Sequence, residues 1–132
     1  MLRRFVPHLL GFLLVSLPAA ALDVVELPAG TGVAAVAVAP DGTAWFSAQF
    51  SGAVGKVSPA GQISLLPFSS RGTQPLGVSV RPDGGAWVAD LAGERLGTVG
   101  PDGRLVEVPL PRAGGEPTGA AAAGDGAVWV TL

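Results

Sequence analysis

Three aspartates recur at a fixed spacing of 42 residues, and repeated carboxylates raise the question of a metal site. Asp41, Asp83 and Asp125 are each followed by glycine. Carboxylate oxygens are ligands that Mg²⁺ or Ca²⁺ would accept. An Asp-Gly pair is equally typical of a tight turn, in which the carboxylate accepts hydrogen bonds from backbone N–H groups. Since the spacing places the three aspartates in separate structural units, we predict turn caps and no metal site.

The residue types present exclude most catalytic classes. The sequence has no Cys and one His, His8, which excludes cysteine nucleophiles, thiolate metal sites and a hydrolase triad with a histidine base. The formal net charge is −2 and there is no basic cluster, so nucleic acid is not an expected partner. We therefore expect no catalytic, cofactor-binding or metal-binding residue in this chain.

Residues 1–21 are predicted to be a secretory signal peptide. Arg3 and Arg4 supply positive charge, residues 9–17 form an apolar run, and residues 19–21 offer small side chains for cleavage. An uncleaved membrane anchor and a twin-arginine signal are the alternatives. Cleavage would remove His8 and leave an exported protein, periplasmic or extracellular, without stable membrane insertion.

A repeat of 42 residues organises the rest of the sequence. The tryptophans Trp45, Trp87 and Trp129 follow this spacing. Glycines, valines and prolines stay in the same register: Gly55 with Gly97, Val57 with Val99, Pro59 with Pro101, Pro67 with Pro109, and Pro75 with Pro117. We expect the repeated tryptophans to fill the space between neighbouring units and to be structural.

Each unit contains four short segments typical of β-strands, with a turn after each. In the second unit these are residues 77–80, 86–89, 96–99 and 104–109. The Asp-Gly pairs predict hairpins with a tight primed turn. No window free of Gly and Pro has the apolar spacing of a helix. Four antiparallel strands in about 42 residues correspond to one blade of a β-propeller.

The expected architecture is all-β: an incomplete β-propeller of about two and a half four-stranded antiparallel blades at 22–132. It comprises a lone outer strand at 22–28, blades at 33–68 and 75–110, and a half blade at 117–132. Closed propellers have about four to eight blades. We expect a truncated or partial chain, and self-assembly of several protomers into a ring is the alternative.

Four polar residues are candidates for contacting a small-molecule or peptide ligand. Gln49 and Asp90 follow the second strands of their units, and Arg71 and Glu116 lie on the connections between units. All four are expected at the end where propellers usually bind ligands. As ordinary solvated loop residues they would have no such role, and both interpretations stay open.

The second unit begins with the sequence Pro-Leu-Gly-Val-Ser-Val-Arg-Pro-Asp-Gly-Gly-Ala-Trp-Val-Ala-Asp at residues 75–90. This segment resembles the repeats of the streptogramin lyase family. The same pattern is followed by residues 45–48, 54–57 and 106–111. The resemblance implies a seven-bladed propeller that linearises a cyclic depsipeptide by elimination, with Mg²⁺ steadying the enolate-like charge. That Mg²⁺ is expected only of complete family members. The family's catalytic histidines and glutamates lie in its C-terminal blades, and none can be placed on this chain.

The expected function is thus an exported streptogramin lyase-like propeller fragment that is inactive by itself. The alternative is a non-catalytic extracytoplasmic NHL-like propeller module that binds a peptide, glycan or protein partner. A lactonase-like enzyme is a weaker candidate, because such sites gather several acidic ligands around one ion.

Overall fold

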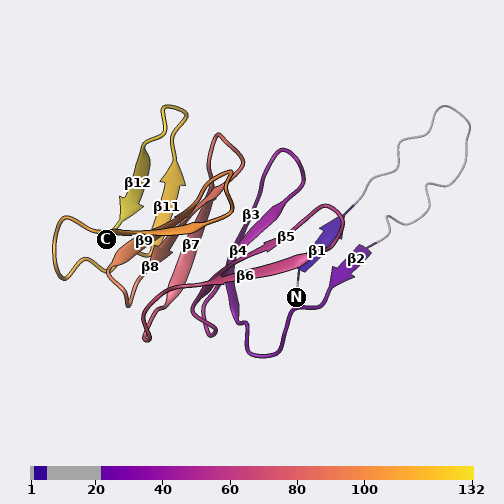
Figure 1. The fold of residues 1–132 in the computed structure, drawn as a ribbon, viewed down its shortest axis with the longest axis horizontal. Helices are drawn as coiled ribbons and strands as arrows, with labels where there is room; N and C mark the ends of the chain where they lie inside the picture. The colour runs from indigo at the N-terminus through magenta and orange to yellow at the C-terminus, as the bar shows by residue number, and fades with distance from the viewer. Residues whose placement is uncertain (1, 6–21) are drawn as a thin grey trace, which may run out of the picture.

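The structure, a computed structural model, describes residues 2–5 and 22–132 (Figure 1). Residues 2–5 belong to the expected signal peptide. There Leu2–Phe5 forms strand β1, which pairs antiparallel with β2, Leu22–Val25. The rest of the expected signal peptide lies outside the described residues. The described ranges hold no helix, and hence none with the length and apolar character needed to cross a bilayer.

Beyond β2 the chain forms two four-stranded antiparallel sheets and a hairpin, in chain order. The first sheet contains β3 (Val33–Val38), β4 (Ala44–Ala48), β5 (Ala53–Val57) and β6 (Ile63–Pro67). The second sheet contains β7 (Pro75–Val80), β8 (Ala86–Asp90), β9 (Arg95–Val99) and β10 (Leu105–Pro109). The third sheet contains β11 (Gly119–Ala122) and β12 (Val128–Thr131). This arrangement confirms the predicted all-β fold of four-stranded antiparallel units.

The sheets stand side by side with their first strands adjacent (Figure 1). Strand β7 lies against β3 on one side and against β11 on the other. The approach is close at Gly77, where a Cβ atom would lie 2.6 Å from the carbonyl oxygen of Thr118 and 2.7 Å from the Cα of Gly119. Only glycine fits there without moving backbone.

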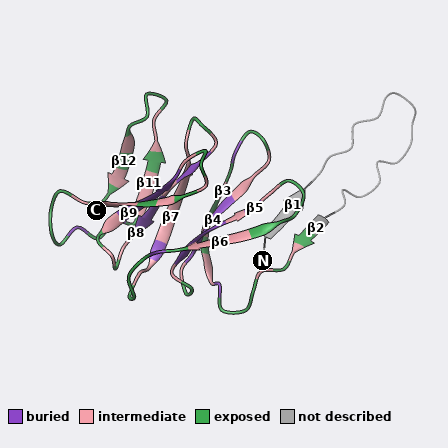
Figure 2. Cartoon of the chain, in the orientation of Figure 1, coloured by how far each residue is buried: buried purple, intermediate pink, exposed green. Residues whose placement is uncertain are grey.

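Burial is concentrated in the middle strands of the first and second sheets (Figure 2). One apolar cluster joins these two sheets and includes Trp45, Val54, Phe68, Val88 and Val99. A second cluster, built on Phe46, covers the opposite face of the first sheet, where Val25 and Leu27 pack against it. The end of β2 and the segment after it therefore cover a face that would otherwise meet water.

The tryptophans do not share one environment. Trp45 is 4% exposed, and its indole N–H donates a 2.9 Å hydrogen bond to the carbonyl oxygen of Gly84 in the second sheet. Trp87 is half-buried under the guanidinium of Arg81. Trp129 is 75% exposed, because no described sheet follows β12. The expectation that all three fill spaces between units is confirmed at Trp45 and wrong at Trp129.

The Asp-Gly turns also differ from the predicted primed type. At the first hairpin the N–H of Gly42 donates a hydrogen bond to the carbonyl oxygen of Ala39 at 2.9 Å. The N–H of Ala39 donates to the carbonyl oxygen of Thr43 at 2.8 Å. Gly42 has φ of 90°, whereas the one described non-glycine residue with positive φ is Glu94. A type I′ turn needs positive φ at both central residues. The turn is instead a three-residue loop whose glycine forms a bulge.

Candidate functional site

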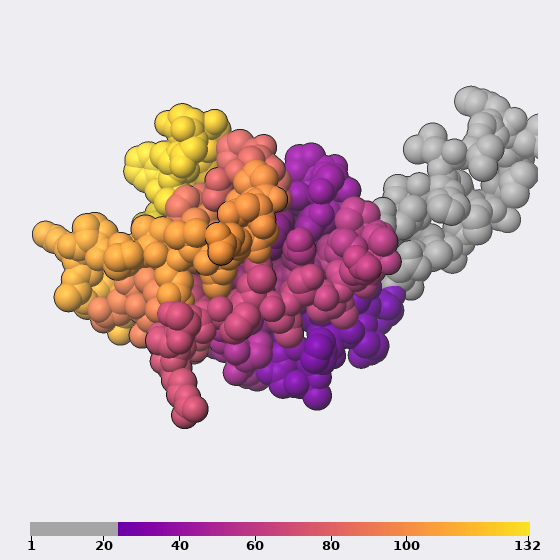
Figure 3. All heavy atoms as spheres, in the orientation of Figure 1, coloured from indigo at the N-terminus to yellow at the C-terminus, as the bar shows by residue number. Residues whose placement is uncertain are grey.

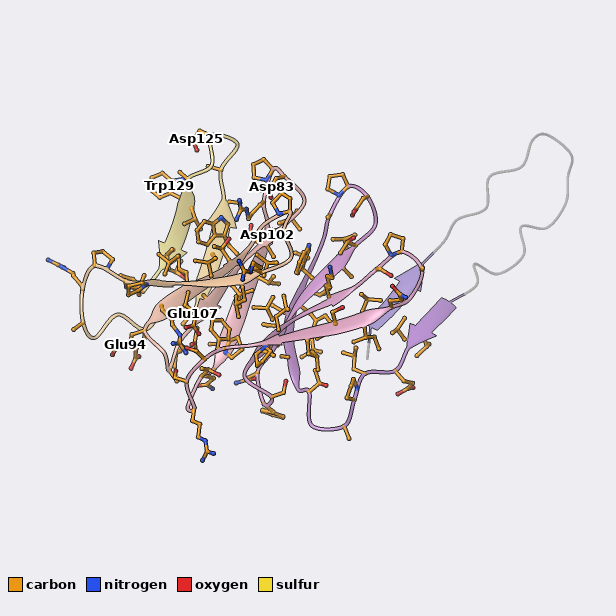
Figure 4. All side chains as sticks on the ribbon, in the orientation of Figure 1. Asp83, Glu94, Asp102, Glu107, Asp125 and Trp129 are labelled. Atoms are coloured by element: carbon orange, nitrogen blue, oxygen red, sulfur yellow. The ribbon has the colours of Figure 1, made fainter. Side chains whose placement is uncertain are left out.

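The repeated aspartates cap their own turns. One Asp41 oxygen accepts the N–H of Thr43 at 2.8 Å, and Asp83 and Asp125 accept the corresponding N–H groups at 3.0 Å. The Thr43 N–H, followed by its hydroxyl, lowers the pKa of Asp41. Asp83 and Asp125 lie at the upper edge of Figure 4, at separate hairpins. The prediction of turn caps is confirmed.

The residues present do not fit a Mg²⁺ ion. Within residues 2–5 and 22–132, no three His, Cys, Asp or Glu side chains come close enough to hold a metal together. Mg²⁺ usually needs one or two free carboxylates supplemented by substrate oxygens and water. Asp90 has a fully buried carboxylate, and both of its oxygens accept hydrogen bonds from protein donors. The described residues therefore hold no carboxylate cluster that could bind the ion by itself.

Asp90 ends β8 with a fully buried side chain. One of its oxygens accepts the N–H groups of Gln74, at 2.7 Å, and Gly93, at 3.2 Å; the other accepts Nε of Arg95 at 2.9 Å. These bonds join the start of β7 to the β8–β9 turn. A direct ligand contact by this predicted site residue would require the network to open.

The network continues into the connection between the first and second sheets. Arg95 donates to the hydroxyl of Ser70 at 2.7 Å and lies 3.4 Å from Glu107. Glu107 accepts the hydroxyl of Ser69 at 2.5 Å and its N–H at 2.8 Å. The hydroxyl, and then the N–H, of Ser69 lower the pKa of Glu107. These contacts hold the β6–β7 connection against the second sheet.

Sequence reasoning missed this network, although the repeat register carried a signal. The residues 42 positions before Asp90, Arg95 and Glu107 are Ala48, Ala53 and Leu65. In the first sheet those three positions belong to the apolar cluster around Phe46. A change from three apolar residues to three charged ones at matched positions indicates an ion network in the second unit.

The remaining predicted site residues lie on the turns and connections opposite the Asp-Gly hairpins. Arg71 is exposed on the β6–β7 connection, which projects at the lower edge of the surface in Figure 3. Gln49 is half-buried in the β4–β5 turn, and its N–H bonds the carbonyl oxygen of Gly32 at 2.7 Å. Glu116 is exposed on the β10–β11 connection. Whether this end binds a ligand stays a prediction.

A surface depression of about 350 Å³ lies between the β4–β5 turn and the β6–β7 connection. Its lining includes Phe50, 78% exposed, and Arg71, which makes no ion pair or hydrogen bond with any described residue. The other lining residues are Ser51, Gly52, Pro67, Phe68, Ser69, Ser70, Gly72 and Thr73; neither Glu116 nor Asp90 belongs to the lining. The arrangement offers hydrogen-bond donors, a cation and an aromatic ring, a set suited to binding.

The stacked four-stranded sheets, with loops gathered at one end, define a β-propeller. The model of the virginiamycin B lyase family matches residues 17–132, and the chain belongs to this family. This confirms the resemblance to streptogramin lyases. No curated protein sequence matches the chain significantly.

Solved structures agree with this assignment. One similar structure is a catalytically inactive histidine-to-alanine variant of virginiamycin B lyase from Staphylococcus aureus, with quinupristin. Its sequence is 27% identical to this chain, and the TM-score is 0.77. The alignment covers 85% of this chain and 39% of the lyase chain. A selenomethionine form of the lyase from the same organism is 26% identical, with the same TM-score and coverage. A putative gluconolactonase, 18% identical with a TM-score of 0.59, covers 84% of this chain and 46% of its own and shares the fold alone. The chain thus spans about two fifths of the lyases that it matches.

Proposed function

We propose that this chain supplies the N-terminal blades of an exported streptogramin lyase-like propeller. The observation that carries the proposal is the family match over residues 17–132. In the proposed reaction a base removes a proton alpha to a carbonyl, and the ester C–O bond of a cyclic depsipeptide breaks with formation of an alkene and a free carboxylate. The similarity to a lyase variant with quinupristin supports this substrate class.

By itself the chain is proposed to be inactive. Its one histidine, His8, lies in the proposed signal peptide. Asp90 and Glu107, two carboxylates of the second sheet, accept hydrogen bonds from protein donors. A carboxylate used in this way is a poor general base, because its lone pairs are directed at the protein.

The experiment incubates the purified full chain with quinupristin and Mg²⁺. Elimination gives an isomer of the same mass, so the product is followed by chromatographic retention and by the NMR signals of its new vinyl protons. Staphylococcus aureus virginiamycin B lyase is the positive control, and its inactive histidine-to-alanine variant is the matched negative control. We expect unchanged quinupristin; product above the negative control would contradict the proposed inactivity.

Export is proposed from the N-terminal pattern and is tested separately. We expect the protein recovered from the periplasm or medium of a bacterial host to begin at residue 22. N-terminal sequencing and intact mass decide the matter. A protein that keeps Met1 and stays with the cytoplasmic fraction would contradict export.

Binding without catalysis is the second candidate function. The depression that contains Phe50 and Arg71 favours it, since an exposed ring and an unpaired guanidinium are ready for a ligand. This candidate stands whether or not a longer protein has lyase activity.

A further inference from the structure

The internal repeat provides a control for the residues of the depression. Phe50 and Arg71 correspond, 42 residues later, to Ala92 and Ala113. The second sheet forms the same β8–β9 turn and the same kind of connection with alanine at both positions. A blade of this fold therefore needs neither the aromatic ring nor the guanidinium, and their presence in the first unit calls for another explanation.

Phe50 is held in place without being buried. Its N–H bonds the carbonyl oxygen of Thr31 at 3.2 Å, and its ring lies so close over Gly32 that any Cβ atom there would overlap it. The ring is nevertheless 78% exposed. An exposed aromatic ring that is held over Gly32 offers a large apolar face for contact with a ligand.

Arg71 differs from Arg95, the other arginine near this connection. Arg95 is paired with Asp90 at 2.9 Å and donates to Ser70. Arg71 lines the depression without such a partner among the described residues. A free guanidinium presents a planar fork of donors that matches a carboxylate in two parallel hydrogen bonds.

The rest of the lining favours an acceptor-rich ligand. The ten lining residues include no acidic side chain. The Ser70 hydroxyl oxygen accepts the bond from Arg95 and so keeps its own hydrogen for donation. A volume of about 350 Å³ is in the range of small-ligand sites, near the lower end of about 300–1,000 Å³.

We propose that this depression binds an organic carboxylate that carries an apolar or aromatic group. The carboxylate pairs with Arg71, and the apolar group lies on the ring of Phe50. The C-terminus of a peptide ending in a bulky apolar residue has this chemistry. The inference rests on the second candidate function, binding, and is independent of the lyase reaction.

The first experiment titrates the full chain with N-acetyl-L-phenylalanine and, in parallel, with its amide, which lacks the charge. NMR signals of the backbone amides at 50–52 and 69–73 report binding at this site. We expect saturable shifts with the acid and affinity at least fivefold weaker for the amide, as a lost charged hydrogen bond predicts. Equal affinity of acid and amide would overturn the ligand class while leaving binding intact, and absence of shifts with both would overturn the site.

The second experiment uses Arg71→Ala and Phe50→Ala, the residues that the second unit tolerates at the matched positions. Each is expected to weaken binding of the acid about fivefold or more. Arg112→Ala, at an exposed arginine of the equivalent connection, is the control and should bind as the parent does. Circular dichroism and the combined emission of the three tryptophans verify folding. Unchanged affinity in Arg71→Ala, or inorganic phosphate binding as tightly as the acid, would overturn the proposal.

Discussion

The indole N–H of Trp45 donates a 2.9 Å hydrogen bond to the carbonyl oxygen of Gly84, 39 residues along the chain. This bond connects the second strand of the first sheet to the Asp-Gly turn of the second. Below it, the Ser47 hydroxyl bonds the carbonyl oxygen of Leu76 at 2.5 Å. Two side chains of β4 thus hold the neighbouring sheet through its backbone.

The Trp45 contact predicts a difference between two equivalent tryptophans. Trp45→Phe removes a buried donor and leaves the Gly84 oxygen without its partner, so the free energy of unfolding should fall by about 1–3 kcal/mol. Trp129→Phe, at a 75% exposed position, should stay within about 0.5 kcal/mol of the parent. Urea denaturation compares the two variants. Equal destabilisation would contradict the contact between sheets.

The close approach at Gly77 predicts a specific intolerance. Gly77→Ala places a Cβ against the backbone of Thr118 and Gly119, and overpacking of this kind destabilises by about 1–3 kcal/mol or more. Gly124→Ala is the matched control, because its Cβ would meet nothing within 4 Å and its φ is not positive. Denaturation midpoints of the two variants are compared with that of the parent. Equal midpoints for Gly77→Ala and Gly124→Ala would contradict the close contact of Gly77 with Thr118 and Gly119.

The sequence predicted the strands well, because alternation and turn residues act locally. The Asp-Gly pairs and the Trp register located each hairpin. The type of turn was missed, since φ at Asp41 depends on how the two strands meet. The environment of Trp129 was also missed: burial depends on which sheet follows, and residue type carries no such information.

The candidate site was less predictable than the fold. Gln49, Asp90, Arg71 and Glu116 remain candidate ligand contacts, and the sequence could not tell the buried Asp90 from the exposed Arg71. Some bonds of the network join residues 16 to 38 positions apart, such as Gln74 to Asp90 and Ser69 to Glu107. Such pairings follow from the stacking of sheets.

The buried network predicts non-additive mutations. Asp90→Ala removes the carboxylate closer to Arg95, whose side chain is only 13% exposed, and leaves Arg95 with Glu107 at 3.4 Å. Breaking a buried pair destabilises by up to about 3–5 kcal/mol. Replacing Asp90, Arg95 and Glu107 by Ala, Ala and Leu reproduces the apolar set of the first unit. This triple variant should be more stable than Asp90→Ala alone. Denaturation midpoints in the reverse order would contradict the interpretation.

The lowered pKa of Glu107 predicts how stability responds to acid. Because the folded pKa lies below the ordinary 4.5, the contribution of the carboxylate is present above pH 4.5 and is lost as the pH falls through the folded pKa. Ser69→Ala removes the hydroxyl that contributes most to the shift. The variant should therefore be less stable than the parent at pH 7 and approach it as the pH falls through the folded pKa of Glu107. A difference that stays constant with pH would exclude this cause.

Hydrogen exchange at the indole N–H groups tests the stacking of the sheets most directly. NMR of the full chain resolves one such signal for each tryptophan. We expect the Trp45 signal to exchange slowly with deuterium, because its N–H is buried and bonded to the carbonyl oxygen of Gly84. The signal of the exposed Trp129 should be lost at once. Three signals that vanish at the same fast rate would contradict the packing of the first two sheets through Trp45.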